Sequence, residues 1–240
     1  MINFAHRGAS GDYPENTLLA FREAIKVGAT GFELDVHKTK DNKIVVIHDE
    51  DIERTFLGKG LIKDLTLEEL QKFKCRKVLF RNLTNCYIPT LEEVLEIVKS
   101  NNLILNIELK TDEIHYIDIE KDVIDLVKKY EVENKIIISS FNPESIKICK
   151  DIDSEIKTGF LYCKPIVNVI EKAKKLKANA IHPSFELVSK KLIQKAHENN
   201  LEVNIFTVNS PRDMRRVINM KADGIFTDYP GLLNQIISEE

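Results

Sequence analysis

Short runs rich in β-branched and aromatic residues alternate along this chain with longer segments in which apolar residues recur three and four positions apart. The first pattern predicts strands and the second predicts amphipathic helices, and their alternation is typical of a parallel sheet with crossover helices. The expected strands are residues 2–5, 31–36, 103–109, 135–140, 157–162, 180–182, 202–208 and 224–227, and the clearest helices are residues 16–27, 91–100, 117–130, 143–151, 167–176, 189–199 and 211–220.

Eight such strands in 240 residues predict the α/β fold class, and within it a TIM-like (β/α)8 barrel. One segment departs from the rhythm, because Asp41-Asn42 predicts a turn and residues 43–48 a strand that returns beside the second barrel strand. Residues 49–87 are polar and irregular with a short helix near 67–73, so we expect a small insertion that forms a lid over one end of the barrel. No linker-like stretch interrupts the sequence, and a single domain over residues 1–240 is expected.

Composition argues against several classes of function. Lys and Arg number 35 and Asp and Glu number 38, so the chain lacks the basic excess of a nucleic-acid-binding protein. We find neither a signal-like segment nor an apolar run of about eighteen residues, and we expect a cytoplasmic protein without stable membrane insertion. The four cysteines lack C-x-x-C spacing and receive no metal or redox role, and homo-oligomer formation is left open.

Charged residues interrupt three otherwise apolar strands of the predicted barrel, whose functional end is formed by the carboxyl ends of the strands. Side chains two positions apart on a strand point to the same side, so paired charges on one strand would face the barrel interior together. The residues concerned are His6 and Arg7 after the first strand, Glu33 and Asp35 in the second, and Glu108 and Lys110 in the third.

The three carboxylates are costly to bury when only Arg7 and Lys110 are at hand to neutralise them. An ion-pair layer that fixes packing would explain one pair of charges, whereas three carboxylates favour a bound divalent cation. Glu33, Asp35 and Glu108 offer hard oxygen ligands, which favours Mg²⁺ or Ca²⁺ over zinc. Arg7 and Lys110 beside such an ion would suit a phosphate group.

His6 and His48 are expected near the barrel mouth. Histidine accepts and donates protons near neutral pH, so this pair would serve the attacking and departing groups of a displacement. His182 is left open between a place at the mouth and a packing role at its strand end. The remaining histidines are interpreted as structural: His37, His115 and His197.

An ordered series of motifs runs along nearly the whole chain. Its members are His6-Arg7-Gly8, Pro14-Glu15-Asn16-Thr17, Gly31-Phe32-Glu33-Leu34-Asp35-Val36, Val46-Ile47-His48-Asp49, the segment 88–95, Asn106-Ile107-Glu108-Leu109-Lys110, and the late segments 204–209 and 223–230. In order and spacing the series resembles the glycerophosphodiester phosphodiesterase family. A match of this many motifs is far more specific than a lone His-Arg-Gly.

The resemblance implies a TIM-like barrel enzyme that uses a divalent cation to hydrolyse small-molecule glycerophosphodiesters, such as glycerophosphocholine and glycerophosphoethanolamine, to glycerol 3-phosphate and an alcohol. Position by position it implies catalytic His6 and His48, metal-binding Glu33, Asp35 and Glu108, phosphate-binding Arg7 and Lys110, and a glycerol surface at Phe206, where many relatives have tryptophan. Phe56-Leu57-Gly58 and the lack of a glycine in residues 73–87 depart from the family pattern and predict an altered leaving-group pocket.

For the reaction we expect general acid–base cleavage with His6 as base and His48 as acid, and we leave open whether water or the glycerol 2-hydroxyl attacks. One rival is a lysophospholipase D or phospholipase C-like enzyme on intact lipid, for which the basic residues of segment 74–81 would contact a membrane. We favour a solvated lid for that segment. The other rival, a non-catalytic barrel that binds phosphorylated ligands, does not require two proton-transfer groups.

Overall fold

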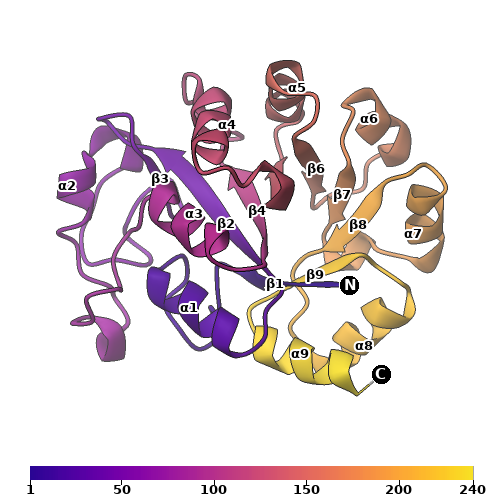
Figure 1. Cartoon of the computed structure of the whole chain (residues 1–240), viewed down its shortest axis with the longest axis horizontal. Coiled ribbons are helices and arrows are strands. Elements are labelled where there is room, and N and C mark those ends of the chain that lie inside the picture. Colours follow the sequence, from indigo (N-terminus) through magenta and orange to yellow (C-terminus); the bar gives the residue numbers. More distant parts are fainter. Residues whose placement is uncertain (240) are drawn as a thin grey trace.

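The computed structural model describes residues 1–239 and contains the predicted closed barrel (Figure 1). Its parallel strands follow the order β1-β9-β8-β7-β6-β5-β4-β2, and pairing between β1 and β2 closes the sheet. The short strand β3 (Ile44–Val46) runs antiparallel to β2, as the turn at Asp41-Asn42 predicts. The barrel strands are β1 (Ile2–His6), β2 (Gly31–Lys38), β4 (Ile104–Leu109), β5 (Ile136–Ser140), β6 (Lys157–Tyr162), β7 (Ala180–Pro183), β8 (Glu202–Ile205) and β9 (Gly224–Thr227).

Helices cover the outside of the barrel and follow the predicted segments with small shifts at their ends. Thr90 begins α3 with a capping box to Glu93, and Ser210 caps α8, because both side chains accept a backbone N–H of the first helical turn. Helix α9 was not among the clearest predicted helices. The helices are α1 (Leu18–Lys26), α2 (Leu67–Leu70), α3 (Leu91–Lys99), α4 (Ile119–Lys129), α5 (Pro143–Ile152), α6 (Val169–Lys175), α7 (Lys190–His197), α8 (Pro211–Asn219) and α9 (Pro230–Ser238).

Strand β8 is shorter than predicted. Its ladder with β9 ends at Ile205, and Phe206 instead pairs with Ser184 at the end of β7. Phe206 therefore lies beside the end of β7, immediately before the Thr207-Val208-Asn209 loop.

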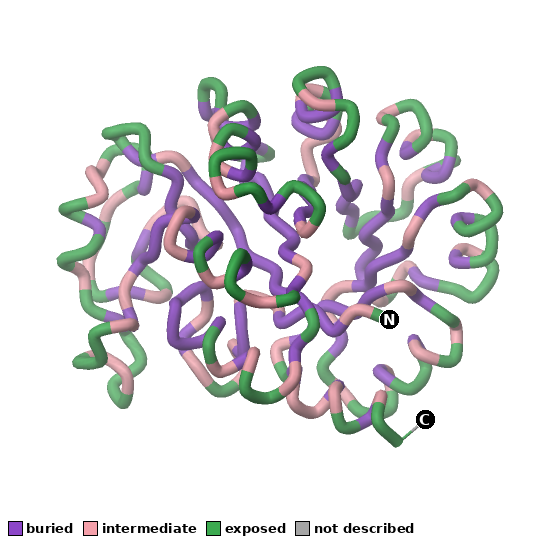
Figure 2. The backbone as a smooth tube through the Cα atoms, in the orientation of Figure 1, coloured by how far each residue is buried: buried purple, intermediate pink, exposed green. Residues whose placement is uncertain are grey.

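The barrel interior contains both apolar and polar side chains, and Figure 2 shows that the strands are buried while the outer sides of the helices are exposed. Phe4 stacks on Phe226 with 4.6 Å between ring centroids. His182 is fully buried beside Phe226, and Asn204 donates a hydrogen bond to its Nε2 atom. A Cβ atom on Gly159 would lie 2.3 Å from the His182 ring. The structure thus places His182 in the packed interior, where a glycine makes room for it.

Residues 49–87 form an insertion with a hydrophobic cluster of its own, seen on the left of Figure 1 beside β3. Ile52, Phe56 and Leu70 pack there against Val45 and Ile47, which flank or belong to β3. Besides α2 it contains the short 3₁₀ helices η1 (Ile62–Asp64) and η2 (Val78–Phe80). The predicted interruption of the strand–helix alternation in this segment is confirmed.

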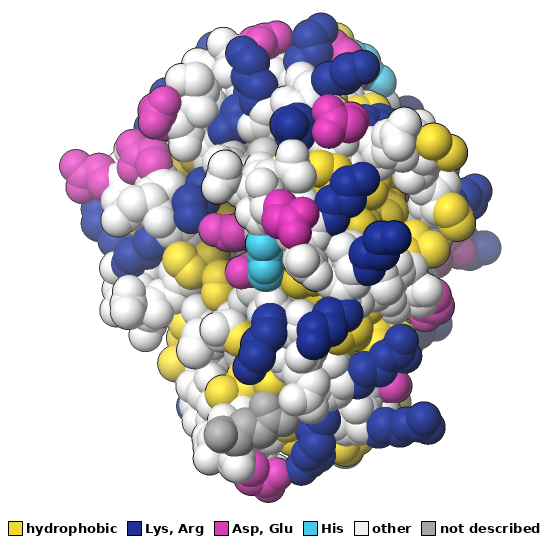
Figure 3. All heavy atoms as spheres, turned by 90° about the vertical axis from the view of Figure 1, so that its right-hand side faces the viewer, with side chains coloured by type: hydrophobic (Ala, Val, Ile, Leu, Met, Phe, Trp, Pro, Cys, Tyr) yellow, Lys and Arg dark blue, Asp and Glu magenta, His cyan; other side chains and the backbone are white. Residues whose placement is uncertain are grey.

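Charged side chains of both signs intermingle on the side of the molecule that carries α7 (Figure 3). None of the strongly exposed large apolar residues belongs to α7 or α8. Within residues 1–239, no helix combines the length and apolarity needed to span a bilayer.

Candidate active site

Strand register brings the predicted site residues of the adjacent strands β1, β2 and β4 together, with the three acids on β2 and β4. In the β1–β2 pair His6 lies opposite Glu33, and in the β2–β4 pair Asp35 lies opposite Glu108. The carboxylates of Glu33, Asp35 and Glu108 each place an oxygen within 4.8 Å of the other two. Side chains two apart do share one face, as the alternation of a strand predicts.

The hydrogen bonds around these carboxylates leave one buried oxygen free. Asn16 donates to Asp35 Oδ2 at 2.9 Å, but Asp35 Oδ1 has no hydrogen-bond partner among the described residues. Glu33 accepts the backbone N–H of Arg7 at 3.0 Å, and Glu108 accepts the ammonium of Lys110 at 3.0 Å. An unpaired buried carboxylate oxygen is costly, and a cation coordinated among the three acids would satisfy it.

Burial and the neighbouring charges shift the pKa values of the three acids in different directions. Burial and the negative charges of Asp35 and Glu108 raise the pKa of Glu33 well above its usual value. Burial and the charge of Asp35 raise the pKa of Glu108 to about 7. Burial opposes ionisation of Asp35 as well, but Arg7, His48 and Lys110 hold its pKa below the usual range. This donor set of crowded, hard oxygen atoms fits a divalent cation.

A tight turn after β1 positions Arg7 at the cluster. Arg7 adopts a left-handed backbone conformation (φ 57°), and Gly8 follows with φ 80°. A Cβ atom on Gly8 would lie 2.7 Å from the carbonyl carbon of Ala20, so the turn requires glycine. The guanidinium of Arg7 lies 3.3 Å from Asp35 and donates to Glu15 at 3.0 Å.

His6 is held by a carboxylate from the last strand of the barrel. Its Nδ1 atom lies 2.6 Å from Asp228 Oδ1, and Asp228 also accepts hydrogen bonds from Ser10 and Asn209. Burial opposes ionisation of Asp228, but these hydrogen bonds lower its pKa, so it stays negative. With the proton on Nδ1 facing Asp228, the Nε2 atom is the free acceptor, and it lies 3.9 Å from Glu33.

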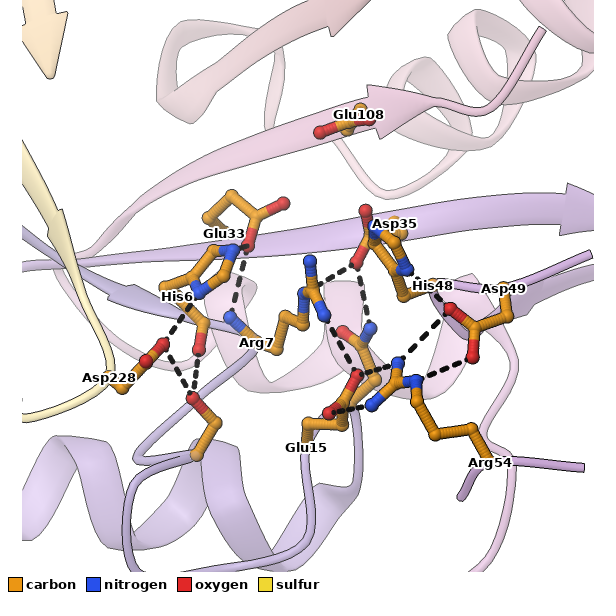
Figure 4. Close-up of polar contacts among 12 residues, drawn as sticks. His6, Arg7, Glu15, Glu33, Asp35, His48, Asp49, Arg54, Glu108 and Asp228 are labelled. Atoms are coloured by element: carbon orange, nitrogen blue, oxygen red, sulfur yellow. Dashed lines mark hydrogen bonds and ion pairs between the residues drawn. The ribbon is translucent and has the colours of Figure 1, made fainter. Parts of the chain in front are cut away.

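His48 has a matching arrangement on the other side of the cluster (Figure 4). Its Nδ1 atom lies 2.6 Å from Asp49 Oδ1, and its Nε2 atom lies 3.4 Å from the Lys110 ammonium. Arg54 donates to Asp49 at 2.6 Å and makes two hydrogen bonds to Glu15. The two imidazoles therefore present their Nε2 atoms to the carboxylate cluster from opposite sides.

Two cavities adjoin these groups. A small one of about 20 Å³ is lined by His6, Glu33, Glu108 and Phe206, and the Phe206 ring contacts Phe141 edge to face at 5.9 Å. A larger one of about 230 Å³ lies between the β1 turn and the insertion, and its lining includes Glu15, Arg54, Phe56, Cys75, Arg76 and Lys77.

All the site residues predicted from the sequence lie at this end of the barrel, while several contacts that orient them were not assigned. Asp228 directly follows strand β9, and Asp49 directly follows His48. Both are charged residues next to a strand end or a motif residue, which is the signal by which the other site residues were selected. Nothing in the sequence pattern tells which carboxylate reaches which ring. His37, interpreted as structural, is buried and contacts the hydroxyl of Tyr116 and the carbonyl of His48.

The chain matches the model of the glycerophosphoryl diester phosphodiesterase family over residues 6–232. A glycerophosphodiester phosphodiesterase of Caldanaerobacter subterraneus is 38% identical over 233 residues, which cover 97% of this chain and 96% of that protein. The chain belongs to this family. It is accordingly an enzyme, a phosphodiesterase of the glycerophosphodiester class.

One solved structure and one further sequence relative also match the chain over nearly its whole length. A phosphodiesterase from Oleispira antarctica, solved in complex with the product sn-glycerol-3-phosphate, superposes with a TM-score of 0.89 at 26% identity over 98% of this chain and 96% of that one. Human lysophospholipase D GDPD1 is 29% identical over 273 residues, covering 98% of this chain and 85% of that protein. The TIM barrel predicted from the sequence is thus the fold of the family's solved structures.

Proposed function

We propose that the enzyme hydrolyses glycerophosphodiesters such as glycerophosphocholine and glycerophosphoethanolamine to glycerol 3-phosphate and an alcohol, with His6 and His48 as the catalytic pair. The observation that carries this proposal is the placement of two carboxylate-held imidazoles on opposite sides of three buried carboxylates. Binding alone would not call for two oriented proton-transfer groups, so the site favours catalysis.

Glu33, Asp35 and Glu108 are the proposed ligands of a divalent cation, Mg²⁺ or Ca²⁺. The free oxygen of Asp35 and the raised pKa values of its two neighbours support this assignment. When bound, the cation would supply positive charge to the phosphate during displacement. Arg7 and Lys110, both paired with these acids, are proposed to add further positive charge there.

The two cavities support different roles for the two histidines. His6 shares the small cavity with Phe206, the proposed glycerol surface, so we assign it as the base for water or for the glycerol 2-hydroxyl. His48 is linked through Asp49 and Arg54 to the larger cavity, so we assign it as the acid that protonates the departing alcohol. In this arrangement the proton on each Nδ1 stays on the ring, hydrogen-bonded to the carboxylate, and each Nε2 exchanges the reacting proton.

The larger cavity is the proposed leaving-group pocket, and the insertion 49–87 is proposed as its wall and lid within one functional domain, 1–240. Phe56 and Cys75 of the insertion line this cavity. Phe56 belongs to the stretch that departs from the family pattern, which supports a head-group preference particular to this enzyme.

A second candidate is lysophospholipase D activity on intact lysolipid. The similarity to the human enzyme of that name supports it. The two candidates differ in whether the enzyme accepts a substrate with an acyl chain on its glycerol. A comparison of soluble glycerophosphodiesters with a lysolipid distinguishes them.

A substrate panel tests these proposals. Purified enzyme is incubated with glycerophosphocholine, glycerophosphoethanolamine and lysophosphatidylcholine, each with Mg²⁺, Ca²⁺ or a chelator, and glycerol 3-phosphate and free head group are measured. We expect cation-dependent release of glycerol 3-phosphate from the glycerophosphodiesters. Choline release from the lysolipid alone would favour the second candidate, and activity on any substrate unaffected by chelator would contradict the metal assignment.

A further inference from the structure

The insertion projects a short apolar turn into solvent at η2. Leu79 is 89% exposed and Val78 is 74% exposed, and Leu83 follows with 46%. Single exposed apolar residues are common on protein surfaces, but adjacent ones that are this exposed are not. We call the segment 74–83 the basic tip, because four cationic residues accompany these apolar side chains.

The cations of the basic tip have no acidic side-chain partner within residues 1–239. In the described part of the chain, no carboxylate forms an ion pair with Lys74, Arg76, Lys77 or Arg81. The hydrogen bonds that Arg76 and Arg81 make go to backbone carbonyls, and the Lys77 ammonium donates to the carbonyl of Tyr13. The tip therefore combines exposed apolar side chains with a local excess of positive charge on a chain whose net charge is −3.

Contacts with the rest of the protein hold the basic tip in place. Cys75 pairs with Phe56 in an isolated β-bridge, and the Phe80 ring lies 5.7 Å from that of Tyr13. Arg76 donates to the carbonyls of Glu53 and Phe56. A preformed element of this kind loses little conformational entropy when it binds a surface.

The sequence alone favours a solvated lid for this segment, but the exposure of Val78 and Leu79 changes that interpretation, and we propose that the basic tip docks the enzyme on an anionic lipid bilayer. Val78 and Leu79 would enter the headgroup region, while the cations around them would contact lipid phosphates, which is the chemistry of interfacial membrane binding. An acidic protein surface would match the charges, but it would leave the two most exposed apolar side chains of the tip, Val78 and Leu79, without an apolar environment. The rest of the chain is acidic on balance, so attraction to an anionic membrane must be local.

Docking through the tip would bring the active site close to the bilayer. Arg76 and Lys77 line the same 230 Å³ cavity as Glu15 and Arg54, and Arg54 contacts Asp49, the partner of His48. The membrane contact is thus on the side of the protein where the proposed leaving group departs. The inference concerns binding only, and its failure would leave the proposed hydrolysis untouched.

Vesicle cosedimentation tests the proposal on the full chain. We would compare vesicles of phosphatidylcholine with vesicles of equal parts phosphatidylcholine and phosphatidylglycerol, at low and high salt. We expect binding to the anionic vesicles alone, weakened by salt, since each cation near such a surface strengthens binding about fivefold. The variant K74Q, which removes an exposed cation of the tip, is expected to bind about fivefold more weakly, and V78S/L79S about tenfold more weakly.

Matched controls distinguish vesicle binding through the basic tip from binding through positive charge elsewhere on the surface. K190Q/K191Q removes two exposed cations from the start of α7, and we expect it to bind the vesicles as the wild type does. All variants should melt as the wild type does and hydrolyse soluble glycerophosphocholine at the wild-type rate. Equal sedimentation of wild type with both kinds of vesicle, undiminished binding of V78S/L79S, or an equal loss in K190Q/K191Q would overturn the proposal. So would retention on polyglutamate without any vesicle binding, which would point to an acidic protein.

Discussion

The Nδ1 atom of His6 lies 2.6 Å from Oδ1 of Asp228, so a hydrogen bond at the site joins the end of the first barrel strand to the residue that follows the last one, with which it pairs. The same distance separates His48 from Asp49. A carboxylate on Nδ1 fixes both the ring and its tautomer, which leaves Nε2 to exchange protons. Closure of the barrel is therefore part of how the site is oriented.

Asp228→Asn tests this orientation. The amide can place its nitrogen towards the ring, which favours the wrong tautomer, so we expect kcat to fall by roughly 10²-fold or more while divalent-cation affinity is kept. Steady-state rates on glycerophosphocholine and calorimetric metal titration measure the two effects. Asp151→Asn, at an exposed position of α5, serves as the control and should behave as wild type. An unchanged kcat in D228N would contradict the role of Asp228 in orienting His6.

Glu108→Gln is expected to weaken cation binding without lowering the stability of the metal-free protein at pH 8. The pKa of Glu108 is raised to about 7 in the fold, so its ionisation costs stability as pH rises above the value of about 4.3 for an unfolded glutamate. The metal-free variant should therefore match or exceed wild-type stability at pH 8, with the difference shrinking towards pH 5. A divalent cation at a hundred times its Kd should stabilise wild type by about 2.7 kcal/mol.

Urea unfolding with and without cation measures the metal-free stability of E108Q and its stabilisation by the cation. The variant E144Q, at an exposed position of α5, is its control. Cation stabilisation of E108Q equal to that of wild type would exclude Glu108 as a ligand.

Gly8→Ala should damage the turn that carries Arg7. A side chain there would require a positive φ and would approach Ala20 to 2.7 Å, so we expect a loss of about 2–4 kcal/mol in the free energy of unfolding. Gly231→Ala in α9, whose added Cβ would meet Val27 at 3.1 Å, should change stability by less than about 1 kcal/mol. Similar urea midpoints for the two variants would contradict this view of the turn.

Buried His182 should make the fold sensitive to acid. Burial lowers its pKa to about 3, against about 6.5 in the unfolded chain, so the unfolded state binds the extra proton between these pH values. Stability should therefore fall as pH drops below 6.5, by about 1.4 kcal/mol per pH unit from this group. His182→Gln should flatten that slope, whereas the exposed-residue variant His115→Gln should not. Parallel pH profiles for wild type and H182Q would argue against a buried neutral histidine.

The fold and the centre of the site could be predicted because local rules determine them. Strand alternation placed Glu33 with Asp35 and Glu108 with Lys110, and the barrel rule placed them at one end. The contacts of Asp228, Glu15 and Arg54 depend on which loops meet across the barrel mouth, and no residue spacing encodes that. The early end of β8 was missed because residue spacing does not show where its ladder with β9 stops, which is at Ile205.

The rates of His6→Ala and His48→Ala, measured with saturating Mg²⁺ or Ca²⁺ on glycerophosphocholine, test the central claim most directly. We predict that each variant loses roughly 10²–10⁴-fold in kcat, while calorimetry shows cation binding close to that of wild type. Turnover near the wild-type rate in both variants would contradict the assignment of these histidines as the catalytic pair.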